Sequence, residues 1–303
     1  MEPPADRRAR IGVLINPASG AGRTRRNAAL VLRGLRSGGE AVLVIQGESA
    51  QDAQGRLAEA MAHGLDTLVA VGGDGTVHMA LQAVVGTDTV LGIVPLGTGN
   101  DAAGSVGLAA NRPQDAVSTI LAGHVRAFDV GRVEAADGTV RYFLCVLSTG
   151  FDSSVNERAN AMTWPSGTAL YVRAMLAELR TFRPLSYRTT IDGQERNAQG
   201  MVVSIGNGPS FGGGMQVCHG ADMHDGELDL VWVNALSRFA LLRVFPRIYT
   251  GSHLSHPAIA LRRVRTATLA APGQVAYADG ERIGPLPVTV QAVPDGVRLI
   301  VPG

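Results

Sequence analysis

The sequence predicts an α/β protein with a Rossmann-like parallel-sheet domain over residues 1–128 and an antiparallel β-sandwich domain over residues 129–303. In the first part, short apolar runs alternate with helix-length segments, and three of the runs end on glycine-rich loops. After residue 128 the runs are short, rich in β-branched residues and separated by turn residues. No flexible linker separates the halves, so we expect them to share a cleft, with the extreme C-terminus able to pack back on the first domain.

The first half alternates between predicted strands and predicted helices. Its apolar runs predict strands at 11–15, 41–45, 68–71 and 90–94, and the segments between and after them predict helices at 23–36, 50–63, 76–85 and 113–123. Pro113 suits a first helical turn and Gly123 suits the residue after a helix. Ligands of such sheets bind beyond the carboxyl ends of the strands, which is where all three glycine loops fall.

The second half predicts mostly antiparallel strands. They are expected at 127–134, 141–148, 187–191, 201–205, 227–233, 256–261, 264–269 and 288–292, with turns such as 192–193, 279–280 and 294–296. Two segments, 167–182 and 237–249, instead have apolar residues at helical spacing. They pack on the sheet, or one of them lines an apolar channel or rests on a membrane surface.

Composition excludes several classes of protein. The chain has 303 residues, 46% of them hydrophobic and 17% charged, and a net charge of +1, so we expect a globular protein with no nucleic-acid partner. It contains no lysine, which excludes a Walker-A lysine, a protein-kinase strand lysine and a Schiff-base lysine. Cys145 and Cys218 lie far apart and are expected to be buried thiols in a reducing compartment.

Nothing in the sequence predicts export or a membrane span. The apolar run 11–15 follows three arginines but is shorter than the roughly 7 to 15 residues of a signal-peptide core. No apolar stretch reaches the ~18 residues of a spanning helix. We therefore expect a cytoplasmic protein with, at most, a transient contact with a membrane surface.

The stretch 69–101 indicates the chemistry. One predicted strand ends on Gly72, Gly73, Asp74, Gly75 and Thr76, and the next leads into a second loop that ends on an asparagine and an aspartate. Glycines let backbone N–H groups approach phosphate oxygens, and the helix that follows presents its positive end to the same anion. An aspartate beside phosphate is favourable when Mg²⁺ lies between them, so the pattern predicts a phosphate chain with a divalent cation.

Together these loops resemble the diacylglycerol kinase catalytic superfamily, which includes bacterial soluble diacylglycerol kinases and the sphingosine and ceramide kinases. The resemblance covers nearly the whole chain. NAD kinases and phosphofructokinases also use the Gly-Gly-Asp-Gly-Thr motif at 72–76, so it is the ordered set of motifs that is specific. The motifs are Asn16-Pro17-Ala18-Ser19-Gly20, Gly72-Gly73-Asp74-Gly75-Thr76, Pro95-Leu96-Gly97-Thr98-Gly99-Asn100-Asp101, Phe128-Asp129-Val130-Gly131, Gly206-Asn207-Gly208, Ala221 to Asp229, and Asp279-Gly280-Glu281.

The resemblance implies roles for individual residues, with ATP and Mg²⁺ as cofactors. A nucleotide would be held by Asn16, Pro17, Ala18, Ser19, Gly20, Gly72, Gly73, Asp74, Gly75, Thr76, Gly97, Thr98 and Asn100. The catalytic Mg²⁺ would be held by Asp74, Asp101 and Asp129, and Glu281 would take the proton from the lipid hydroxyl. A structural Mg²⁺ would be held by Asp222, Asp225 and Glu227, although His224 replaces one of two adjacent acids common at this turn.

Three functions follow from these residues. The first is an ATP- and Mg²⁺-dependent lipid kinase with diacylglycerol as the leading acceptor, in which Arg23 or Arg25 would supply the cation that lysine cannot. The second is a kinase of a soluble alcohol such as NAD, and the third is a nucleotide-binding protein without catalysis. The retained Asp74, Asp101 and Glu281 argue against the third. A homodimer is left open.

Overall fold

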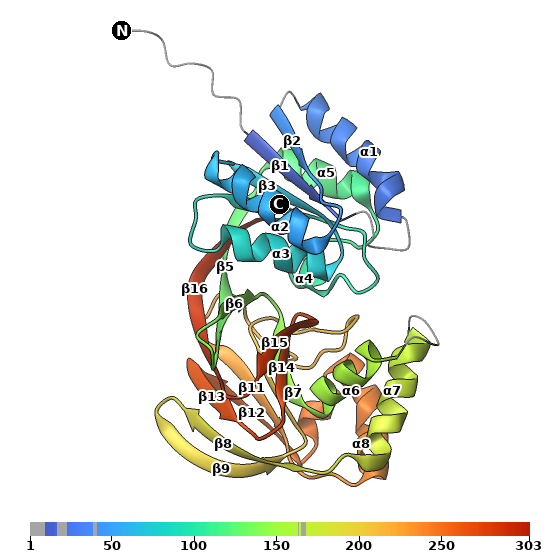
Figure 1. Ribbon diagram of the computed structural model, residues 1–303, viewed down its shortest axis with the longest axis vertical. Helices are drawn as coiled ribbons and strands as arrows, with labels where there is room; N and C mark the ends of the chain where they lie inside the picture. Colours follow the sequence, from blue (N-terminus) through green and yellow to red (C-terminus); the bar gives the residue numbers. More distant parts are fainter. Residues whose placement is uncertain (1–9, 17–22, 39–40, 163, 165–167) are drawn as a thin grey trace. The chain divides into compact units, whose positions relative to one another are not determined.

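The computed structural model describes residues 10–16, 23–38, 41–162, 164 and 168–303. It forms two compact units, one of Met1–Phe128 with Asp295–Gly303 and one of Asp129–Pro294. The chain passes between the units within β5 (Val125–Ala135) and again within β16 (Val288–Ile300). The last stretch, which the sequence suggested could pack back on the first domain, therefore belongs to the first unit by its contacts (Figure 1).

The first unit is built on a parallel sheet with the strand order β2-β1-β3-β4-β16, in which only the end of β16 takes part. Its other strands are β1 (Arg10–Ile15), β2 (Ala41–Ile45), β3 (Thr67–Gly72) and β4 (Val90–Pro95). The chain goes from β1 outward to β2 and then returns to the other side of β1 for β3. The strand order thus reverses between β1 and β3, and ligands of such sheets bind at the carboxyl ends around that reversal.

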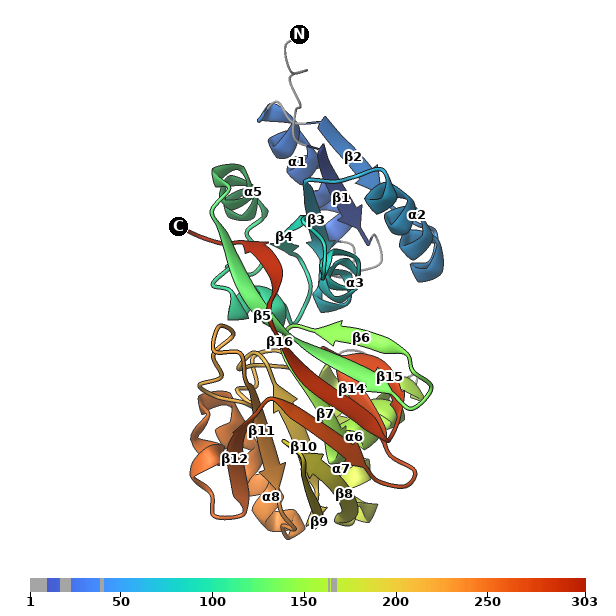
Figure 2. The same cartoon turned by 90° about the vertical axis from the view of Figure 1, so that its left-hand side faces the viewer.

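Helices cover both faces of this sheet, because its central strands are apolar on both sides. They are α1 (Arg23–Ser37), α2 (Ala50–Ala62), α3 (Asp74–Val84), α4 (Asp101–Ser105) and α5 (Pro113–Ala122). The helices α1 and α5 share one core cluster with alternate residues of β3, Val69 and Val71. The intervening residues, Leu68 and Ala70, are fully buried against the other face, where Figure 2 shows α2 and α3. This alternation requires a sheet buried on both sides.

The second unit contains two sheets. One has the order β16-β13-β8-β9 and the other β12-β11-β10-β7-β14-β15, with β6 pairing β5. Their strands are β6 (Val140–Phe143), β7 (Val146–Gly150), β8 (Leu185–Ile191), β9 (Gln194–Gly200), β10 (Val202–Gly206), β11 (Leu228–Val233), β12 (Ile259–Val264), β13 (Thr266–Ala270), β14 (Val275–Ala278) and β15 (Glu281–Pro285). Neighbouring strands in this unit pair in antiparallel fashion, for example β10 with β11, β13 with β8, and β14 with β15, and short turns can join such strands.

The two sheets pack face to face around one apolar core. Tyr187 of β8 and Trp232 of β11 meet in it edge to face, with ring centroids 5.3 Å apart. Val203 and Ile205 of β10 point into this core, whereas Val202 packs in a separate cluster with helices on the opposite face. Those helices are α6 (Phe151–Asn160), α7 (Thr168–Thr181) and α8 (Arg238–Val244), followed by short 3₁₀ turns η2 (Phe245–Thr250) and η3 (Ser252–Ser255). The unit is therefore a sandwich with a helical layer outside.

Several element predictions need correction. The helix expected over 237–249 ends at Val244 and continues as a 3₁₀ turn, because Pro246 cannot donate the hydrogen bond of an α-helix. The strand expected over 141–148 is two strands, β6 and β7, interrupted at Leu144 and Cys145. The turn expected at 294–296 lies inside β16, with Asp295 at a φ of 50°. The helices α4 and α6 and the polar strand β9 were not predicted.

The predicted fold class is confirmed: a parallel α/β domain is followed by an antiparallel β-sandwich. Asp192-Gly193 forms the predicted hairpin turn, with both residues at positive φ. Cys145 and Cys218 are buried and form no disulfide within the described chain, and burial raises the pKa of the Cys218 thiol. Among the described helices, none combines the length and the apolar character needed to cross a bilayer.

Candidate functional site

The two glycine loops of the first unit lie in direct backbone contact. The strands before them are parallel neighbours, so Gly72 lies opposite Pro95, and the Leu96 N–H donates to the Gly72 carbonyl at 2.8 Å. A Cβ built on Gly97 would lie 2.5 Å from the Cα of Gly73, too close for any side chain. The close approach of the two loop backbones therefore requires glycine at this position.

Asp74 ties the first loop to the second. It is the first residue of α3, where a negative side chain is favoured by the helix dipole. Its Oδ2 accepts the Asn100 N–H at 2.7 Å and its Oδ1 accepts the Ala102 N–H at 3.3 Å. The carboxylate is thus held at the start of α4 in a fixed orientation, and one face of it is committed to backbone amides.

Asn100 closes the second loop on itself. Its Oδ1 accepts the Gly97 N–H at 2.8 Å, and its Nδ2 donates to the Gly97 carbonyl at 2.9 Å. The residue is 5% exposed and has a φ of 59°, a conformation that asparagine tolerates better than most residues. The Asn100 side-chain amide is thus used by its own loop, and its N–H by Asp74. The nucleotide-binding role of Asn100 stays a prediction.

Asp101 brings a second carboxylate to the same place. A Cβ built on Gly99 would lie 2.7 Å from Asp74 Oδ2 and 3.3 Å from Asp101 Oδ2, so both carboxylates lie next to the position that a side chain at residue 99 would occupy. Mg²⁺ is commonly held by one or two carboxylates, with the rest of its shell supplied by phosphate oxygens and water. The pair of Asp74 and Asp101 carboxylates fits this kind of site. Among the described residues no group of three or more His, Cys, Asp or Glu side chains converges.

The other residues predicted to bind nucleotide differ in their exposure, and some lie outside the described part of the chain. Thr98 is exposed at the tip of the second loop, and Asn16 is exposed just after β1. Thr76 is 3% exposed, and no residue that the structure describes gives its Oγ1 a hydrogen-bond partner. Pro17, Ala18, Ser19 and Gly20 lie outside the described residues, as do the side chains of Arg23 and Arg25.

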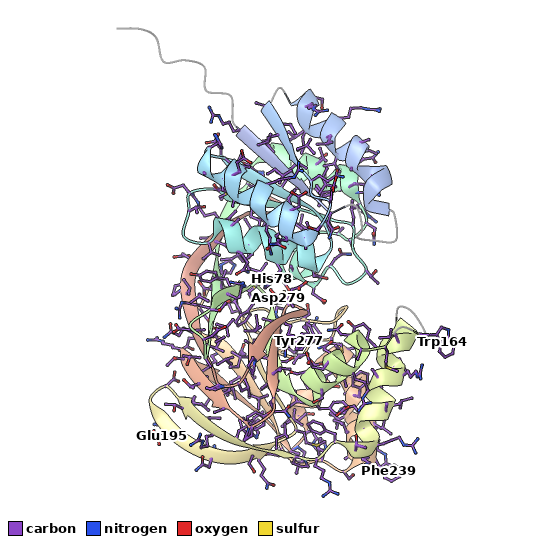
Figure 3. All side chains as sticks on the ribbon, viewed as in Figure 1. His78, Trp164, Glu195, Phe239, Tyr277 and Asp279 are labelled. Atoms are coloured by element: carbon purple, nitrogen blue, oxygen red, sulfur yellow. The ribbon has the colours of Figure 1, made fainter. Side chains whose placement is uncertain are left out.

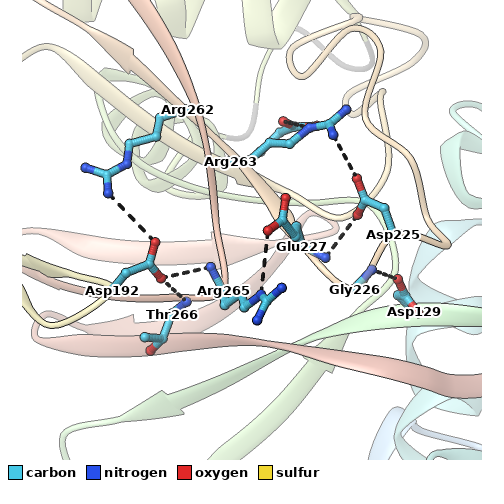
Figure 4. A network of polar contacts seen from close by, with 10 residues as sticks. Asp129, Asp192, Asp225, Gly226, Glu227, Arg262, Arg263, Arg265 and Thr266 are labelled. Carbon is cyan, nitrogen blue, oxygen red and sulfur yellow. Dashed lines mark hydrogen bonds and ion pairs between the residues drawn. The ribbon is translucent and has the colours of Figure 1, made fainter.

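Asp129 belongs to the second unit and holds a turn there. It is 2% exposed, its Oδ2 accepts the Gly226 N–H at 2.7 Å, and its own N–H donates to the Met223 carbonyl at 2.8 Å. Figure 4 shows this bond together with the surrounding charges. The carboxylate therefore fixes the turn that carries Asp225, whatever else it binds.

The turn predicted to hold a structural Mg²⁺ is occupied by internal contacts. Asp222 and Asp225 each accept a backbone N–H two residues ahead, at 3.0 Å. Asp225 also lies 3.6 Å from Arg263, and Glu227 lies 3.6 Å from Arg265 (Figure 4). These acids do not form a three-carboxylate group in the described chain, so a metal bound by all three stays a prediction.

Glu281 is exposed at the start of β15, and the hairpin that carries it is anchored by Asp279 (Figure 3). The Asp279 carboxylate accepts backbone N–H groups from three consecutive residues, Leu144 at 2.7 Å, Cys145 at 3.0 Å and Val146 at 3.1 Å. These N–H groups bond to Asp279 instead of to a neighbouring strand, which explains why the strand is interrupted between β6 and β7. The sequence suggested only a hairpin turn at this aspartate and missed the anchoring role.

A second contact holds the same hairpin from the helical side. The Tyr277 hydroxyl donates to Glu157 Oε1 at 2.5 Å, and Arg282 Nε donates to the same oxygen at 2.8 Å. Burial, and then the Glu157 carboxylate, raise the pKa of Tyr277 to about 12. Glu281 thus extends from a rigidly held hairpin, although its own side chain is free to reach solvent.

Asn207 joins the elements around Asp129 and Asp279. Its Nδ2 donates to the Asp129 carbonyl at 2.9 Å and to the Leu144 carbonyl at 2.8 Å, and its N–H donates to the Cys145 carbonyl at 2.8 Å. The residue is 1% exposed. The sequence signal for Asn207 is a polar residue flanked by glycines after a buried strand, and no role of its own was predicted for it.

Known proteins share both halves of this architecture. Residues 10–133 match the diacylglycerol kinase catalytic domain, and residues 145–301 match the YegS C-terminal NAD kinase beta sandwich-like domain. A diacylglycerol kinase from Mycobacterium tuberculosis (strain ATCC 25618 / H37Rv) is 41% identical over 294 residues, which are 97% of this chain and 95% of that protein.

Solved structures agree in fold. A diacylglycerol kinase structure from Bacillus anthracis str. Sterne has a TM-score of 0.71 at 19% identity, with 97% of both chains covered. Another structure from the same organism has a TM-score of 0.77 at 21% identity, with the same coverage. With the glycine loops, the paired carboxylates and the sandwich all in place, the chain belongs to the diacylglycerol kinase family of lipid kinases.

Proposed function

We propose that this protein transfers the γ-phosphoryl group of ATP, bound with Mg²⁺, to the hydroxyl of diacylglycerol or a similar lipid, giving phosphatidic acid or its analogue. The observation that carries the proposal is the convergence of the Asp74 and Asp101 carboxylates on Gly99, between two glycine loops in backbone contact. Such loops and carboxylates suit a triphosphate and its metal, and family membership supplies the lipid class of acceptor.

The residues of the first unit would align the nucleotide. Backbone N–H groups of the two loops and the N-terminus of α3 would bind phosphate oxygens, and Thr76 Oγ1 is a buried group that a phosphate could satisfy. Asp74 and Asp101 would hold Mg²⁺, which offsets negative charge on the phosphoryl oxygens when bound. Phosphoryl transfer depends mainly on such alignment and charge neutralisation, so few further groups are needed.

Glu281 is the proposed base. In the transfer, the bond between the γ-phosphorus and its bridging oxygen breaks, a new bond forms to the lipid oxygen, and the hydroxyl proton passes to the Glu281 carboxylate. Glu281 suits this role because it is exposed and its hairpin is anchored through Asp279. Asp129 is proposed to assist at the metal, and Asp222, Asp225 and Glu227 to form a structural site for a second cation.

An assay with three acceptor conditions tests the proposal. Consumption of ATP would be measured with dispersed diacylglycerol, with NAD and with no acceptor, each with and without Mg²⁺. Consumption that requires both diacylglycerol and Mg²⁺ supports the proposal. Consumption with NAD would indicate a kinase of a soluble alcohol, and nucleotide binding without turnover in any arm would indicate a non-catalytic protein.

The acceptor itself is a separate question, because an apolar pocket recognises shape and size more than chemical identity. A total lipid extract would be incubated with the protein and isotopically labelled ATP, and the labelled products identified by mass. A product one phosphoryl group heavier than a diacylglycerol supports the leading acceptor. We further propose that the protein meets this lipid by peripheral contact with a membrane surface.

A further inference from the structure

The outer helical layer of the second unit presents an apolar surface that its own fold does not need. The helices α7 and α8 both turn their inner sides toward one apolar cluster, which contains Ala174 and Leu179 of α7 and against which Leu241 of α8 packs. Val202 of β10 packs against that cluster, so the layer covers the face of its sheet opposite the sandwich core. The other sides of α7 and α8 point away from the unit (Figures 1 and 3).

Exposed large apolar side chains concentrate on this outer side. Twelve described large hydrophobic residues are exposed, and seven of them lie in or beside α7, α8 and η2. Phe239 is 79% exposed and Trp164 is 72% exposed, the two largest fractions in that set. The seven are Trp164, Tyr171, Val172, Leu176, Phe239, Leu242 and Tyr249. Single exposed apolar residues are ordinary, but a group of this kind marks an interaction surface.

The same layer is positively charged in a chain that is nearly neutral. From residue 234 to residue 256, the stretch that holds α8, η2 and η3, the sequence has three arginines and no Asp or Glu, although the whole chain has a net charge of only +1. Arg238 and Arg243 of α8 and Arg180 of α7 are exposed, and none forms an ion pair within the described chain. The acid nearest to them on α7 is Glu178, which is already paired with Arg158 at 2.7 Å.

Trp164 and Arg173 combine both properties at one end of the layer. The Arg173 guanidinium lies over the Trp164 ring, 5.6 Å from its centroid, and donates to the Trp164 carbonyl at 2.6 Å. Figure 3 shows Trp164 projecting from the ribbon on the same flank of the unit as Phe239. An aromatic ring held beside a cation suits the interface between acyl chains and headgroups, where tryptophan is enriched.

We propose that the outer side of α7 and α8 is the surface by which this protein docks on anionic lipid bilayers. We define this α7–α8 face by its apolar residues Trp164, Tyr171, Leu176, Phe239 and Leu242 and its arginines Arg173, Arg180, Arg238 and Arg243. Aromatic and aliphatic side chains would enter the headgroup region, and the unpaired arginines would bind lipid phosphates. The face defined in this way contains no acid, and Glu178 of α7 is paired with Arg158, so the charge of the face is complementary to a uniformly anionic lipid surface.

The inference deepens the proposed function, since a lipid kinase must reach an acceptor that resides in a membrane. Its test does not require nucleotide or turnover. Binding would be measured by co-sedimentation with vesicles of phosphatidylcholine containing about one third phosphatidylglycerol, and with vesicles of phosphatidylcholine alone. We expect binding to the anionic vesicles that weakens as salt rises from about 0.05 M to about 0.5 M.

Two double variants separate the charge of the face from its apolar character. Arg238→Gln with Arg243→Gln should weaken binding to anionic vesicles at least about tenfold, since each arginine near such a surface contributes about fivefold. Phe239→Ser with Leu242→Ser should weaken it about tenfold or more by removing the inserted side chains. Both pairs are exposed, so thermal melting should confirm an intact fold.

Matched controls lie in the first unit. Arg33→Gln with Arg36→Gln removes two exposed arginines of α1, and Leu43→Ser with Val44→Ser removes two exposed apolar residues of β2. Both controls should bind as the wild type does. If they weaken binding as much as the α7–α8 variants, the attraction is a property of the whole protein and the proposed face is wrong.

Tryptophan fluorescence gives a direct reading of insertion, because the chain has only two tryptophans. Trp232 is 8% exposed and its indole N–H donates to the Gln199 carbonyl, so a blue shift on adding anionic vesicles would report Trp164. The shift should disappear in Trp164→Phe and persist in Trp232→Phe. A shift that survives in Trp164→Phe would contradict insertion at this place.

Other results of these experiments would contradict the proposed docking surface. Absence of binding, or equal binding to neutral vesicles, would overturn the anionic docking surface. If Phe239→Ser with Leu242→Ser leaves vesicle binding unchanged but converts an oligomer into a monomer in sedimentation analysis, the face joins copies of this chain. Vesicle binding without diacylglycerol phosphorylation in detergent would contradict the proposed function alone, whereas phosphorylation without vesicle binding would contradict this inference alone.

Discussion

The Asn100 N–H donates to Asp74 Oδ2 at 2.7 Å, and this one bond joins the loops that follow β3 and β4. This bond holds the Asp74 carboxylate next to the position that a side chain at residue 99 would occupy, where the Asp101 carboxylate also lies. Asp74 therefore has one structural role and one proposed role toward a ligand. Its two oxygens support the second loop by accepting the Asn100 and Ala102 N–H groups, and the negative charge of the carboxylate would serve the metal and phosphate.

Asp74→Asn should lower turnover by at least about 10²-fold while leaving the fold intact. The asparagine Oδ1 can still accept the Asn100 N–H, but the neutral amide cannot replace the carboxylate at Mg²⁺. Phosphorylation of diacylglycerol would be measured over a range of Mg²⁺ concentrations, together with the melting temperature. A near wild-type rate with an unchanged melting temperature would remove Asp74 from the mechanism.

Glu281→Gln should also lower turnover by at least about 10²-fold, and should leave ATP binding unchanged, because the amide cannot accept the hydroxyl proton. The side chain is exposed and has no hydrogen bond among those the structure describes, so stability should not change. Exposed Glu195 on β9 offers a matched control, Glu195→Gln, which should keep full activity. Turnover of Glu281→Gln equal to that of the control would exclude the base role.

Gly99→Ala should weaken binding of ATP with Mg²⁺ at least about tenfold. Its new methyl group would lie 2.7 Å from Asp74 Oδ2 and would push the two carboxylates apart. Calorimetric titration gives the affinity. Gly55→Ala in α2 is the control: nothing lies within 4 Å of its Cβ position, so it should keep the affinity and raise the free energy of unfolding by about 0.5–1 kcal/mol.

Asp279→Ala should lower the free energy of unfolding by about 2–4 kcal/mol, because it leaves buried N–H groups of residues 144–146 without their acceptor. Urea denaturation measures the change. Asp137→Ala removes one backbone bond, to Thr139 in an exposed turn, and should cost less than about 1 kcal/mol. Equal losses in the two variants would show that Asp279 does not anchor the hairpin.

His253 should make the protein less stable in mild acid. Burial lowers its pKa below the usual value of about 6.5, and charged Arg247 and His219 nearby act in the same direction. Its Nε2 donates to the Val217 carbonyl at 3.1 Å, and within the described structure Nδ1 has no acceptor for a second proton. The unfolded chain therefore binds the proton more readily than the folded one, and stability falls as pH drops below about 6.5.

The measurement is urea denaturation at pH 7.5 and pH 5.5 for the wild type and for His253→Gln, whose Nε2 can still donate to Val217. The wild type should lose more stability between the two pH values than the variant does. If both lose the same amount, acid sensitivity arises from other groups and His253 contributes nothing to it.

Much of the first unit could be predicted because its signals are local. An apolar run such as 68–71 must be buried on both faces, and the glycines and Asp74 at its end have few other uses beside phosphate. Pro113 and Gly123 bound α5 as expected, because each restricts or permits φ by its own covalent structure. In this part the sequence alone determined the succession of strands and helices, the glycine loops that follow β3 and β4, and the carboxylates beside those loops.

Contacts between residues far apart in the sequence determined the features that the sequence could not predict. The break between β6 and β7 depends on Asp279, more than a hundred residues later, and the amide of Asn100 serves its loop because Gly97 lies within its reach. The helix α6 lacks a strong apolar period, and only packing in the cluster that includes Phe151 and Leu179 holds it. Hydrogen bonds and apolar contacts between residues far apart in the sequence form only once the chain is folded. The local sequence pattern therefore could not show which polar side chains stabilise the fold and which are available to bind a ligand.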